Sequence, residues 1–414
     1  MNNMFVLSKH KDLLLNILEK YGTPLYVYFT DIIKERIMNL KEILDQNFEN
    51  YLIAYACKAC SLLYICKYIS SFGLGAEVVS DGELYIALKA GFERNKIVFD
   101  GVSKSDYEIK YALSQDIYTI NCESFDEVKV ISSIAEGLGM DVNIGLRVNP
   151  EIKLQTHNYL KTGTKYNKFG IDFNDAIMIL DLINKIKNVK LKGFHFHLGS
   201  NIKSPEPFIV AIDKISKLIH LAFKKGYKIE YLDIGGGIPI LSNKEGLHNY
   251  LFPILEFIRK KLLSNVEDLR IILEPGRSIV GDSAVLLTRV NYVKNVDKRK
   301  WILIDAGMND LIRPALYGVF HPIECLSCVS NRIENYSIGG PICESSDVFA
   351  KDIKLPTVRR GDILAFLRVG AYGISMSSNY NSRRRPAVVV IENNNFRLIK
   401  RRENLEDLIS NEIV

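Results

Sequence analysis

Short apolar, β-branched runs alternate with stretches of helical periodicity along much of the chain. Eight runs have the length and composition of buried strands, at 51–56, 76–80, 96–101, 117–122, 142–149, 191–199, 229–237 and 269–276. The spacing of apolar residues between them predicts helices over 60–72, 81–91, 105–115, 124–137, 173–187, 207–225 and 248–264, and one more over 31–47. Eight buried strands alternating with helices favour an α/β fold, a (β/α)8 TIM-type barrel over residues 31–280. A doubly wound open sheet is the alternative, because periodicity does not show whether the sheet closes.

The pattern changes after about residue 280, where alternating and apolar runs recur with turns between them and helical spacing becomes scarce. This pattern of short apolar runs separated by turns is typical of antiparallel strands. PLYVYF at 24–29 is strand-like and follows an amphipathic helix over the first 22 residues. We therefore expect residues 1–30 and 281–414 to form a mainly β domain, with the boundary near 276–284.

Composition adds limits on partners and location. The 54 Lys and Arg residues against 48 Asp and Glu give a net charge of only +6 over 414 residues, which does not indicate nucleic-acid binding. The basic cluster SRRRP at 382–386 has no aromatic stacking pattern around it and reads as a solvated or interfacial cluster. No apolar run reaches the ~20 residues of a membrane helix, and the N-terminus lacks the features of a signal peptide. Seven cysteines in such a chain predict free thiols and a cytoplasmic location.

Candidate reactive residues stand at the ends of the predicted strands, where a barrel places its active site. They are Lys58 after the first strand, His195 and His197 at the sixth, Gly235, Gly236 and Gly237 at the seventh, and Glu274, Gly276 and Arg277 at the eighth. A lysine at a barrel mouth is partly desolvated, which lowers its pKa and makes the amine a nucleophile for Schiff-base chemistry. A solvent-facing lysine is the ordinary alternative for Lys58 taken alone.

The other strand ends suggest an anion site and a planar ligand. The glycine run lets backbone N–H groups approach an anion, and Arg277 suits a phosphate or carboxylate. Glu274 could keep a heteroaromatic nitrogen protonated, although a structural ion pair at the Pro-Gly turn is the alternative. His195 and His197 leave the strand on one face, which suits stacking on a cofactor better than zinc, since further ligands for a metal are lacking. We expect no metal.

Two C-x-x-C pairs, Cys57–Cys60 and Cys325–Cys328, carry no recognisable site. They lie 264 residues apart, from Cys60 to Cys325, whereas the pairs of a zinc ribbon are separated by ~15–20 residues. A thioredoxin-type redox site requires a different fold. Cys343 in GGPICESSD differs from these, because its acidic neighbours would suit a thiol that transfers a proton, or one that is simply buried.

The motifs together resemble those of the barrel-fold (type III) pyridoxal-phosphate decarboxylases, and within that family its diaminopimelate-decarboxylating members. The resemblance covers nearly the whole chain and rests on several long stretches. They are YACKAC (55–60), RVNP (147–150), a TH-N-Y-L-K-TG pattern (156–163), NKFGI (167–171), HFHLGS (195–200), DIGGG (233–237), EPGRSIVGDSAVLLTRV (274–290), DAGMNDLIRPALYGVFHPI (305–323), GPICESSDVFAKD (340–352) and GAYGISMSSNYNSRRRPAVVV (370–390).

The resemblance implies pyridoxal 5'-phosphate as the cofactor and gives each site residue a role. Lys58 would bond the cofactor covalently, His197 would stack on its ring, and Glu274 would pair with the ring nitrogen. The phosphate would be held by Ser200, Gly236, Gly237, Gly276 and Arg277. Substrate would be bound by Arg277, Arg313, Tyr317, Glu344 and Tyr372, with Tyr372 also near the cofactor, and Cys343 would donate a proton. A homodimer with shared active sites is implied, in which the segments of Cys343 and Tyr372 complete the site of the other subunit.

The implied reaction is the decarboxylation of meso-2,6-diaminopimelate to L-lysine and CO2, the last step of lysine biosynthesis by the diaminopimelate route. Two arginines and a glutamate, Arg277, Arg313 and Glu344, suit the zwitterionic distal end of this amino acid, whereas a diamine precursor would need acids only. The alternatives are a decarboxylase of another basic amino acid or carboxynorspermidine, and a non-catalytic relative that binds the cofactor. A racemase is disfavoured because its relatives pair the ring nitrogen with arginine instead of an acid.

Overall fold

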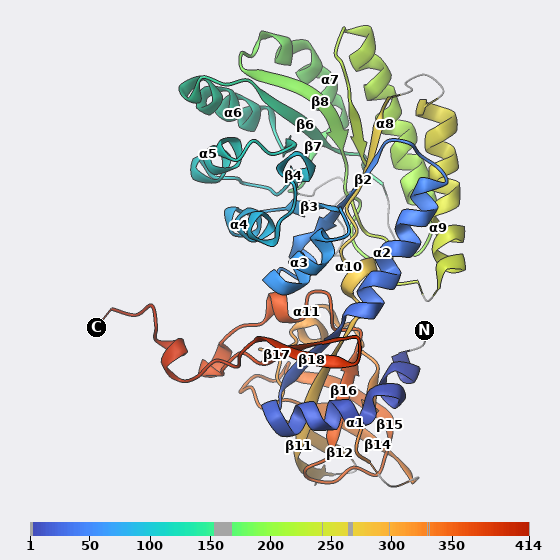
Figure 1. Cartoon of the computed structure of the whole chain (residues 1–414), viewed down its shortest axis with the longest axis vertical. Helices are drawn as coiled ribbons and strands as arrows, with labels where there is room; N and C mark the ends of the chain where they lie inside the picture. The colour runs from blue at the N-terminus through green and yellow to red at the C-terminus, as the bar shows by residue number, and fades with distance from the viewer. Residues whose placement is uncertain are drawn as a thin grey trace. The chain divides into compact units, whose positions relative to one another are not determined.

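The structure is a computed structural model that describes residues 3–152, 168–241, 243–263, 268–297, 299–328, 330 and 332–413. The TH-N-Y-L-K-TG segment at 156–163 and Asn167 lie outside these residues. The chain divides into two compact units, residues 36–278 and residues 1–35 with 279–414. Each unit contains one of the two sheets (Figure 1).

The unit of residues 36–278 is a closed barrel of eight parallel strands. Closure is shown by the pairing of β5 with β6, which joins the two ends of the strand order β5-β4-β3-β2-β10-β9-β8-β6. The strands are β2 (Tyr51–Ala56), β3 (Gly75–Val78), β4 (Ile97–Phe99), β5 (Thr119–Cys122), β6 (Val142–Asn149), β8 (Val189–His195), β9 (Tyr231–Asp233) and β10 (Arg270–Leu273). A two-residue strand, β7 (Ile171–Asp172), pairs only with β6. The prediction of a barrel is therefore confirmed, and the open sheet is excluded.

Helices follow the barrel strands and lie outside them (Figure 1). They are α3 (Leu63–Ser70), α4 (Asp81–Ala90), α5 (Asp106–Ser114), α6 (Phe125–Leu138), α7 (Phe173–Leu182), α8 (Glu206–Lys224) and α9 (Lys244–Ile258), with α2 (Thr30–Asp45) preceding β2. The starts of α4, α5 and α6 are fixed by Ser80, Ser105 and Ser124, whose hydroxyl oxygens accept a backbone N–H three residues on. These caps fix the residue at which each helix begins. They therefore also fix the length of the loops that connect the strands to the helices at the barrel mouth.

A tyrosine fills part of the barrel interior. Tyr231 is fully buried, and its hydroxyl donates to Asn121 Oδ1 at 2.8 Å and lies 3.0 Å from Thr119 Oγ1. Glycines on neighbouring strands leave room for its ring, because a Cβ at Gly193 would lie 2.5 Å from it and one at Gly145 2.1 Å from its hydroxyl. The interior is therefore packed with side chains, as in other barrels of this size.

The second unit is built on a mainly antiparallel sheet. Its strands run in the order β15-β14-β12-β11-β1-β17-β18, with β16 pairing with β11 and β13. They are β1 (Leu25–Phe29), β11 (Ala284–Val296), β12 (Arg299–Ile304), β13 (Ile323–Cys325), β14 (Ile333–Gly339), β15 (Val348–Pro356), β16 (Ile363–Leu367), β17 (Ala387–Glu392) and β18 (Asn395–Lys400). The N-terminal strand β1 lies between β11 and β17, which confirms that PLYVYF joins this sheet.

Apolar side chains from helix α1 (Asn3–Tyr21) cover one side of this sheet. Leu14, Ile17 and Leu18 are buried in one cluster with strand residues that include Val27 and Val389. At ~25 cal/mol per Å2 of apolar surface, burying each such side chain contributes about 1.5 to 3 kcal/mol. The segment before the barrel is therefore an integral part of the β-rich unit.

The sequence predicts that all seven cysteines are free thiols, and the structure differs from this prediction at one pair. Cys325 and Cys328 form a disulfide, so that expectation is wrong for this pair. The turn after β13 brings their Cα atoms to 5.6 Å, within the range that a disulfide spans. The other five cysteines form no disulfide, and Cys343 is exposed whereas the other four are buried. Cys57 and Cys60 are buried, and among the described residues they belong to no group of side chains that could hold a metal ion.

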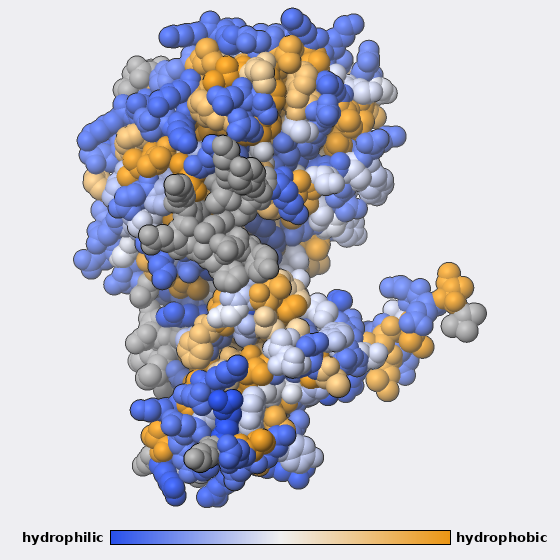
Figure 2. Space-filling model, turned by 180° about the vertical axis from the view of Figure 1, so that it is seen from behind, coloured by the Kyte–Doolittle hydropathy of each residue, from blue (hydrophilic) through white to orange (hydrophobic). Residues whose placement is uncertain are grey.

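The surface carries mostly hydrophilic side chains. On the face drawn in Figure 2, apolar side chains form scattered patches between them. Within the described part of the chain, none of the helices combines the length and the apolar character needed to cross a bilayer.

Candidate active site

Lys58 lies directly after the first barrel strand, in the short 3-10 turn η1 (Cys57–Ala59). Its side chain is 30% exposed, and Nζ lies 2.7 Å from Oε1 of Glu77, which is fully buried at the end of β3. Burial raises the pKa of Glu77, and the Lys58 ammonium opposes this shift. The buried carboxylate thus holds the amine at the barrel mouth without covering it.

Glu83 is a second acid close to Lys58. Its carboxyl accepts the N–H of Val79 at 3.0 Å, and its own N–H donates to Ser80 Oγ at 3.2 Å, which completes the cap of α4. Burial, with repulsion from Glu77, raises the pKa of Glu83 to about 7. The folded chain therefore keeps a proton on this carboxyl over a range in which the unfolded chain has lost it.

We expect Glu83→Gln to stabilise the protein above pH 7. A carboxyl with a raised folded pKa binds more protons when folded, so its stabilising effect is lost as pH rises from the unfolded value towards 7. The neutral amide keeps an acceptor for the N–H of Val79 and removes this loss of stability, which is on the order of 3 kcal/mol at pH 8. Denaturant titration at pH 5 and pH 8 would check this. An increase in the free energy of unfolding that is as large at pH 5 as at pH 8 would contradict this prediction. Glu93→Gln, which replaces an exposed acid of the same unit, is the control.

Two histidines at the end of β8 approach one buried carboxylate. His195 Nε2 lies 3.6 Å from Glu274 Oε2, and His197 Nδ1 lies 3.9 Å from the same oxygen. Asp100, at the end of β4, lies 3.3 Å from His195 Nε2. The two histidines therefore share a face, as their i, i+2 spacing predicts, and they meet Glu274 at the end of β10.

Glu274 has the surroundings of a proton-holding group. It is 2% exposed, and neither of its carboxyl oxygens accepts a hydrogen bond from a donor among the described residues. Burial, together with repulsion from Asp100 and Glu77, holds the pKa of Glu274 well above its usual range. A buried acid in this state can hand its proton to a basic ring nitrogen and remain beside it as the counter-charge.

His197 carries the opposite shift. Burial, with repulsion from Lys58 and Arg147, holds the pKa of His197 well below its usual range, so the imidazole is neutral. Its Nδ1 accepts the N–H of Gly236 at 3.1 Å, which leaves the ring proton on Nε2. A neutral, oriented imidazole can stack on a cationic aromatic ring without charge repulsion.

The loops after β8, β9 and β10 bring together residues that were predicted to hold a phosphate. Ser200 Oγ accepts from Arg277 Nη2 at 3.1 Å, which brings these two predicted phosphate ligands together. Gly237 has a φ of 96°, and a Cβ there would lie 2.4 Å from the carbonyl oxygen of Gly199. A Cβ at Gly276 would lie 2.9 Å from that of Ala59. Only glycine lets these loops approach each other so closely, and a partly buried guanidinium beside a hydroxyl suits a phosphate.

The predicted substrate residues of the β-rich unit form a group of their own. Arg313, in α11 (Arg313–Tyr317), is 3% exposed, and its guanidinium carbon lies 5.3 Å from the ring centre of Tyr317 and 5.5 Å from that of Tyr372. Tyr372 has a φ of 58°, a left-handed conformation that is uncommon for a bulky residue. The two rings hold the guanidinium in place for a carboxylate.

Cys343 and Glu344 lie on an exposed loop of the same unit, and this loop is held by its backbone. Asp347, which is buried, accepts the N–H of Ile342 and that of Met308 at 2.7 Å each. The N–H of Cys343 donates to Asn381 Oδ1 at 2.7 Å. These bonds fix the peptide that carries the thiol while leaving the thiol exposed, as a proton donor to an external site requires.

Three buried acids of this site were missed in the sequence: Glu77, Asp100 and Asp233. Burial and the neighbouring Glu274 hold the pKa of Asp233 well above its usual range. Glu77 is the single charged residue in its apolar run, whereas the runs of Asp100 and Asp233 also contain Lys96 and Glu230. A lone carboxylate within an apolar strand is costly unless it is paired, so this signal could have identified Glu77.

Comparisons with known proteins agree with this geometry. Residues 31–281 match the family described as "Pyridoxal-dependent decarboxylase, pyridoxal binding domain". The diaminopimelate decarboxylase of Aquifex aeolicus is 40% identical over 396 residues, covering 96% of this chain and 93% of the relative. That of Helicobacter pylori strain J99 is 41% identical, covering 95% of this chain and 96% of the relative.

Solved structures give the same result. The crystal structure of diaminopimelate decarboxylase from Helicobacter pylori complexed with L-lysine matches with a TM-score of 0.89 at 39% identity, covering 96% of this chain and 98% of that one. That of the Methanocaldococcus jannaschii enzyme, also with L-lysine, matches with a TM-score of 0.88 at 36% identity, covering 97% and 94%. With the lysine, histidine, glycine and glutamate at the barrel mouth, these matches show that the chain belongs to the pyridoxal-dependent decarboxylases, in the diaminopimelate decarboxylase family.

Proposed function

We propose that this protein decarboxylates meso-2,6-diaminopimelate to L-lysine and CO2 with pyridoxal 5'-phosphate, as the last step of lysine biosynthesis by the diaminopimelate route. The observation that carries the proposal is the buried Glu274, which has a raised pKa, faces His197 and lies in the same barrel mouth as Lys58. We place the activity in the cytoplasm, because five of the seven cysteines form no disulfide.

The residues of the barrel mouth fit the cofactor. Lys58 would hold its aldehyde carbon, His197 its ring face, and Glu274 its ring nitrogen, while Ser200, Gly236, Gly237, Gly276 and Arg277 would hold the phosphate. When bound, the cofactor supplies an electron sink for the pair left when the Cα–carboxylate bond breaks. Glu274 contributes by keeping a proton at its carboxyl available to the ring nitrogen, because an ionised carboxylate at this buried position would be unstable without a cation beside it.

The proton that replaces CO2 at Cα must come from a defined donor. We assign this role to the Cys343 thiol, which is exposed and whose backbone is anchored by Asn381. Arg277, Arg313 and Glu344 match the carboxylate and ammonium at the distal end of diaminopimelate. Tyr317 and Tyr372 hold the Arg313 guanidinium in place, which restricts its rotation and favours bidentate binding of a carboxylate.

A substrate panel tests the assignment. Purified holoenzyme should release CO2 from meso-diaminopimelate and form L-lysine in equal amount, with little release from ornithine, arginine or carboxynorspermidine. Release from one of these other amines alone would overturn the substrate while leaving the reaction type. Cofactor binding without CO2 release from any member of the panel would instead support the non-catalytic relative.

We further propose a homodimer in which Cys343 and Tyr372 of one subunit complete the site that contains Lys58 of the other. This predicts complementation between Lys58→Ala and Cys343→Ala, each of which is expected to be nearly inactive alone. After subunit exchange half of the dimers are mixed, and each mixed dimer has one intact site, so activity should return to about a quarter of the wild-type value. Native mass spectrometry would verify the exchange. Mixed dimers that remain inactive would show that each site is built from one chain.

A further inference from the structure

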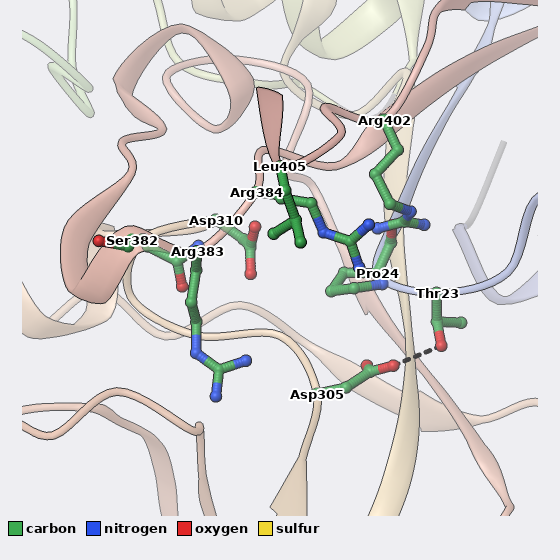
Figure 3. Close-up of a pocket in the computed structure, with 10 residues that line it drawn as sticks. Thr23, Pro24, Asp305, Asp310, Ser382, Arg383, Arg384, Arg402 and Leu405 are labelled. Atoms are coloured by element: carbon green, nitrogen blue, oxygen red, sulfur yellow. Dashed lines mark hydrogen bonds between the residues drawn. The ribbon is translucent and has the colours of Figure 1, made fainter. Parts of the chain in front are cut away.

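The β-rich unit contains a pocket that the proposed reaction does not use. It has a volume of about 340 Å3, within the range typical of small-molecule sites. It is lined by Thr23, Pro24, Asp305, Asn309, Asp310, Ser382, Arg383, Arg384, Arg402 and Leu405 (Figure 3). The segments that form it are far apart in sequence and are brought together by β1, β12 and β17, so the pocket is a product of the fold.

Three guanidinium groups give this pocket an excess of positive charge. Arg383 and Arg384 form no ion pair with any residue that the structure describes, and Arg402 donates to the carbonyl oxygens of Pro24 at 2.8 Å and Tyr21 at 3.3 Å. Burial lowers the pKa of Arg402, and repulsion from Arg384 contributes to the shift. Asp305 and Asp310 offset part of this charge, and an anion placed among the three guanidinium groups would relieve the repulsion that remains.

The same pocket presents buried acceptors that have no donor. Asp310 and Asn309 are each 2% exposed, and Oδ1 of each accepts no hydrogen bond among the described residues. Asp310 Oδ2 accepts the N–H of Gly307 at 2.9 Å, which fixes the carboxyl, and in the view of Figure 3 this carboxyl lies between the side chains of Arg383 and Leu405. An unpaired buried acceptor is destabilising, so a donor on a ligand would be stabilising here.

Asp305 has less capacity for such a ligand, because both of its carboxylate oxygens already accept hydrogen bonds. Its carboxylate accepts from Thr23 Oγ1, from Thr288 Oγ1 at 2.6 Å and from the N–H of Arg289 at 2.9 Å. Asp310 is different, since burial raises its pKa to about 7, and no cation offsets this shift fully. The arginines can therefore bind anionic groups of a ligand. Asp310 can accept a hydrogen bond from one donor group, preferably a cationic one.

We propose that this pocket binds an acidic α-amino acid, with its carboxylates on Arg383, Arg384 and Arg402 and its ammonium on Asp310 Oδ1 and Asn309 Oδ1. The three arginines outnumber the two aspartates, so the lining carries a net positive charge, which an acidic amino acid of net charge −1 complements. Two carboxylates match the guanidiniums better than one, and the ammonium supplies the donor that the buried acceptors lack. No residue of the proposed active site lines this pocket, so the site goes beyond the decarboxylase function.

The pocket is connected to the loop of Cys343. Arg383 Nη2 donates to the carbonyl oxygen of Pro341 at 3.4 Å, and Asn381 holds the N–H of Cys343. A ligand that draws Arg383 onto its carboxylate would remove the bond to Pro341, two residues before the thiol. We therefore expect the ligand to lower kcat, a consequence that rests on the proposed function, whereas binding to the pocket does not.

Isothermal titration of the holoenzyme with L-glutamate tests the site directly. We expect saturable binding that weakens at least tenfold in Arg384→Ala and in Asp310→Asn, and is unchanged in Arg359→Ala, an exposed arginine outside the pocket. Glutarate, which lacks the ammonium, should bind at least tenfold more weakly than L-glutamate to the wild type and should be unaffected by Asp310→Asn. Arg384 is exposed and unpaired, so its variant should keep the wild-type melting temperature and basal kcat.

The outcomes separate the claims. No saturable binding of L-glutamate, or binding that Arg384→Ala leaves unchanged, would overturn the site. Glutarate or inorganic phosphate that binds as tightly as L-glutamate would overturn the zwitterionic ligand, because an anion alone would then suffice. A lower kcat with L-glutamate in the wild type and not in Arg384→Ala would support the coupling to Cys343, and an unchanged kcat at saturation would overturn it. Loss of decarboxylation in every protein would refute the proposed function without altering the binding result.

Discussion

Replacement of Lys58 by alanine is expected to abolish decarboxylation, with a fall in kcat of about 10³-fold or more, as for the loss of other covalent groups. The amine is partly exposed at the barrel mouth and is held by Glu77 at 2.7 Å, and the described residues place no second lysine beside Glu274. The bound cofactor should also lose its characteristic visible absorbance, since that depends on the covalent bond to the lysine. Absorbance spectra and CO2 release on the same preparations would measure both effects.

Two controls separate chemistry from folding. Lys58→Ala leaves the fully buried Glu77 without its cation, so a loss of activity could follow from local disorder. Lys58→Arg keeps a positive charge beside Glu77 but cannot form the same covalent bond, and should be as inactive as the alanine variant while retaining the wild-type melting temperature. Lys67→Ala, an exposed lysine of α3, should be fully active. An active Lys58→Arg variant with normal absorbance would contradict the assigned role.

The sequence pattern predicts the barrel well because each strand and helix is periodic over its own length. The strand predicted over 142–149 coincides with β6 (Val142–Asn149), and that over 51–56 with β2 (Tyr51–Ala56). The later strands end earlier than predicted: β9 ends at Asp233 and not at residue 237, because Gly235 and Gly237 have φ values of 68° and 96° that are incompatible with a strand. The error occurs where the chain leaves the strand to form the loop of Gly236 and Gly237, to which we assign phosphate binding.

Site residues can be predicted from the sequence when an unusual residue type stands at the end of a strand. Properties that depend on contacts between residues of different strands are harder to predict. Lys58, His197 and Glu274 can be named from their positions alone. The raised pKa of Glu274 cannot, because it depends on Asp100 and Glu77, which come from two other strands and approach only when the barrel closes. The disulfide between Cys325 and Cys328 could not be predicted from the sequence either. It depends on the local backbone geometry, because C-x-x-C spacing alone does not fix the distance between the two Cα atoms.

Replacement of Glu274 by glutamine should lower kcat by about 10²- to 10³-fold, the range measured when one preorganised electrostatic group is removed from an active site. Glutamine is neutral at all pH values, so it can no longer supply a proton to the ring nitrogen or act as its counter-charge. The protein should bind the cofactor, because Lys58 and the residues to which we assign phosphate binding are unchanged. Single-turnover measurements would place the loss in the chemical step and not in substrate binding.

The stability of Glu274→Gln is expected to change in the opposite direction to its activity. The folded pKa of Glu274 is raised by burial and by Asp100 and Glu77, so the folded chain gains from the proton on this carboxyl below the unfolded pKa and loses that gain as pH rises. A neutral glutamine removes the loss, and Glu274→Gln without cofactor should therefore be at least as stable as the wild type at pH 8. A structural role would instead predict lower stability together with lower activity. A variant that keeps kcat within threefold of the wild type would contradict the assignment, because a group that holds the ring proton cannot be replaced by an amide without a large loss of rate.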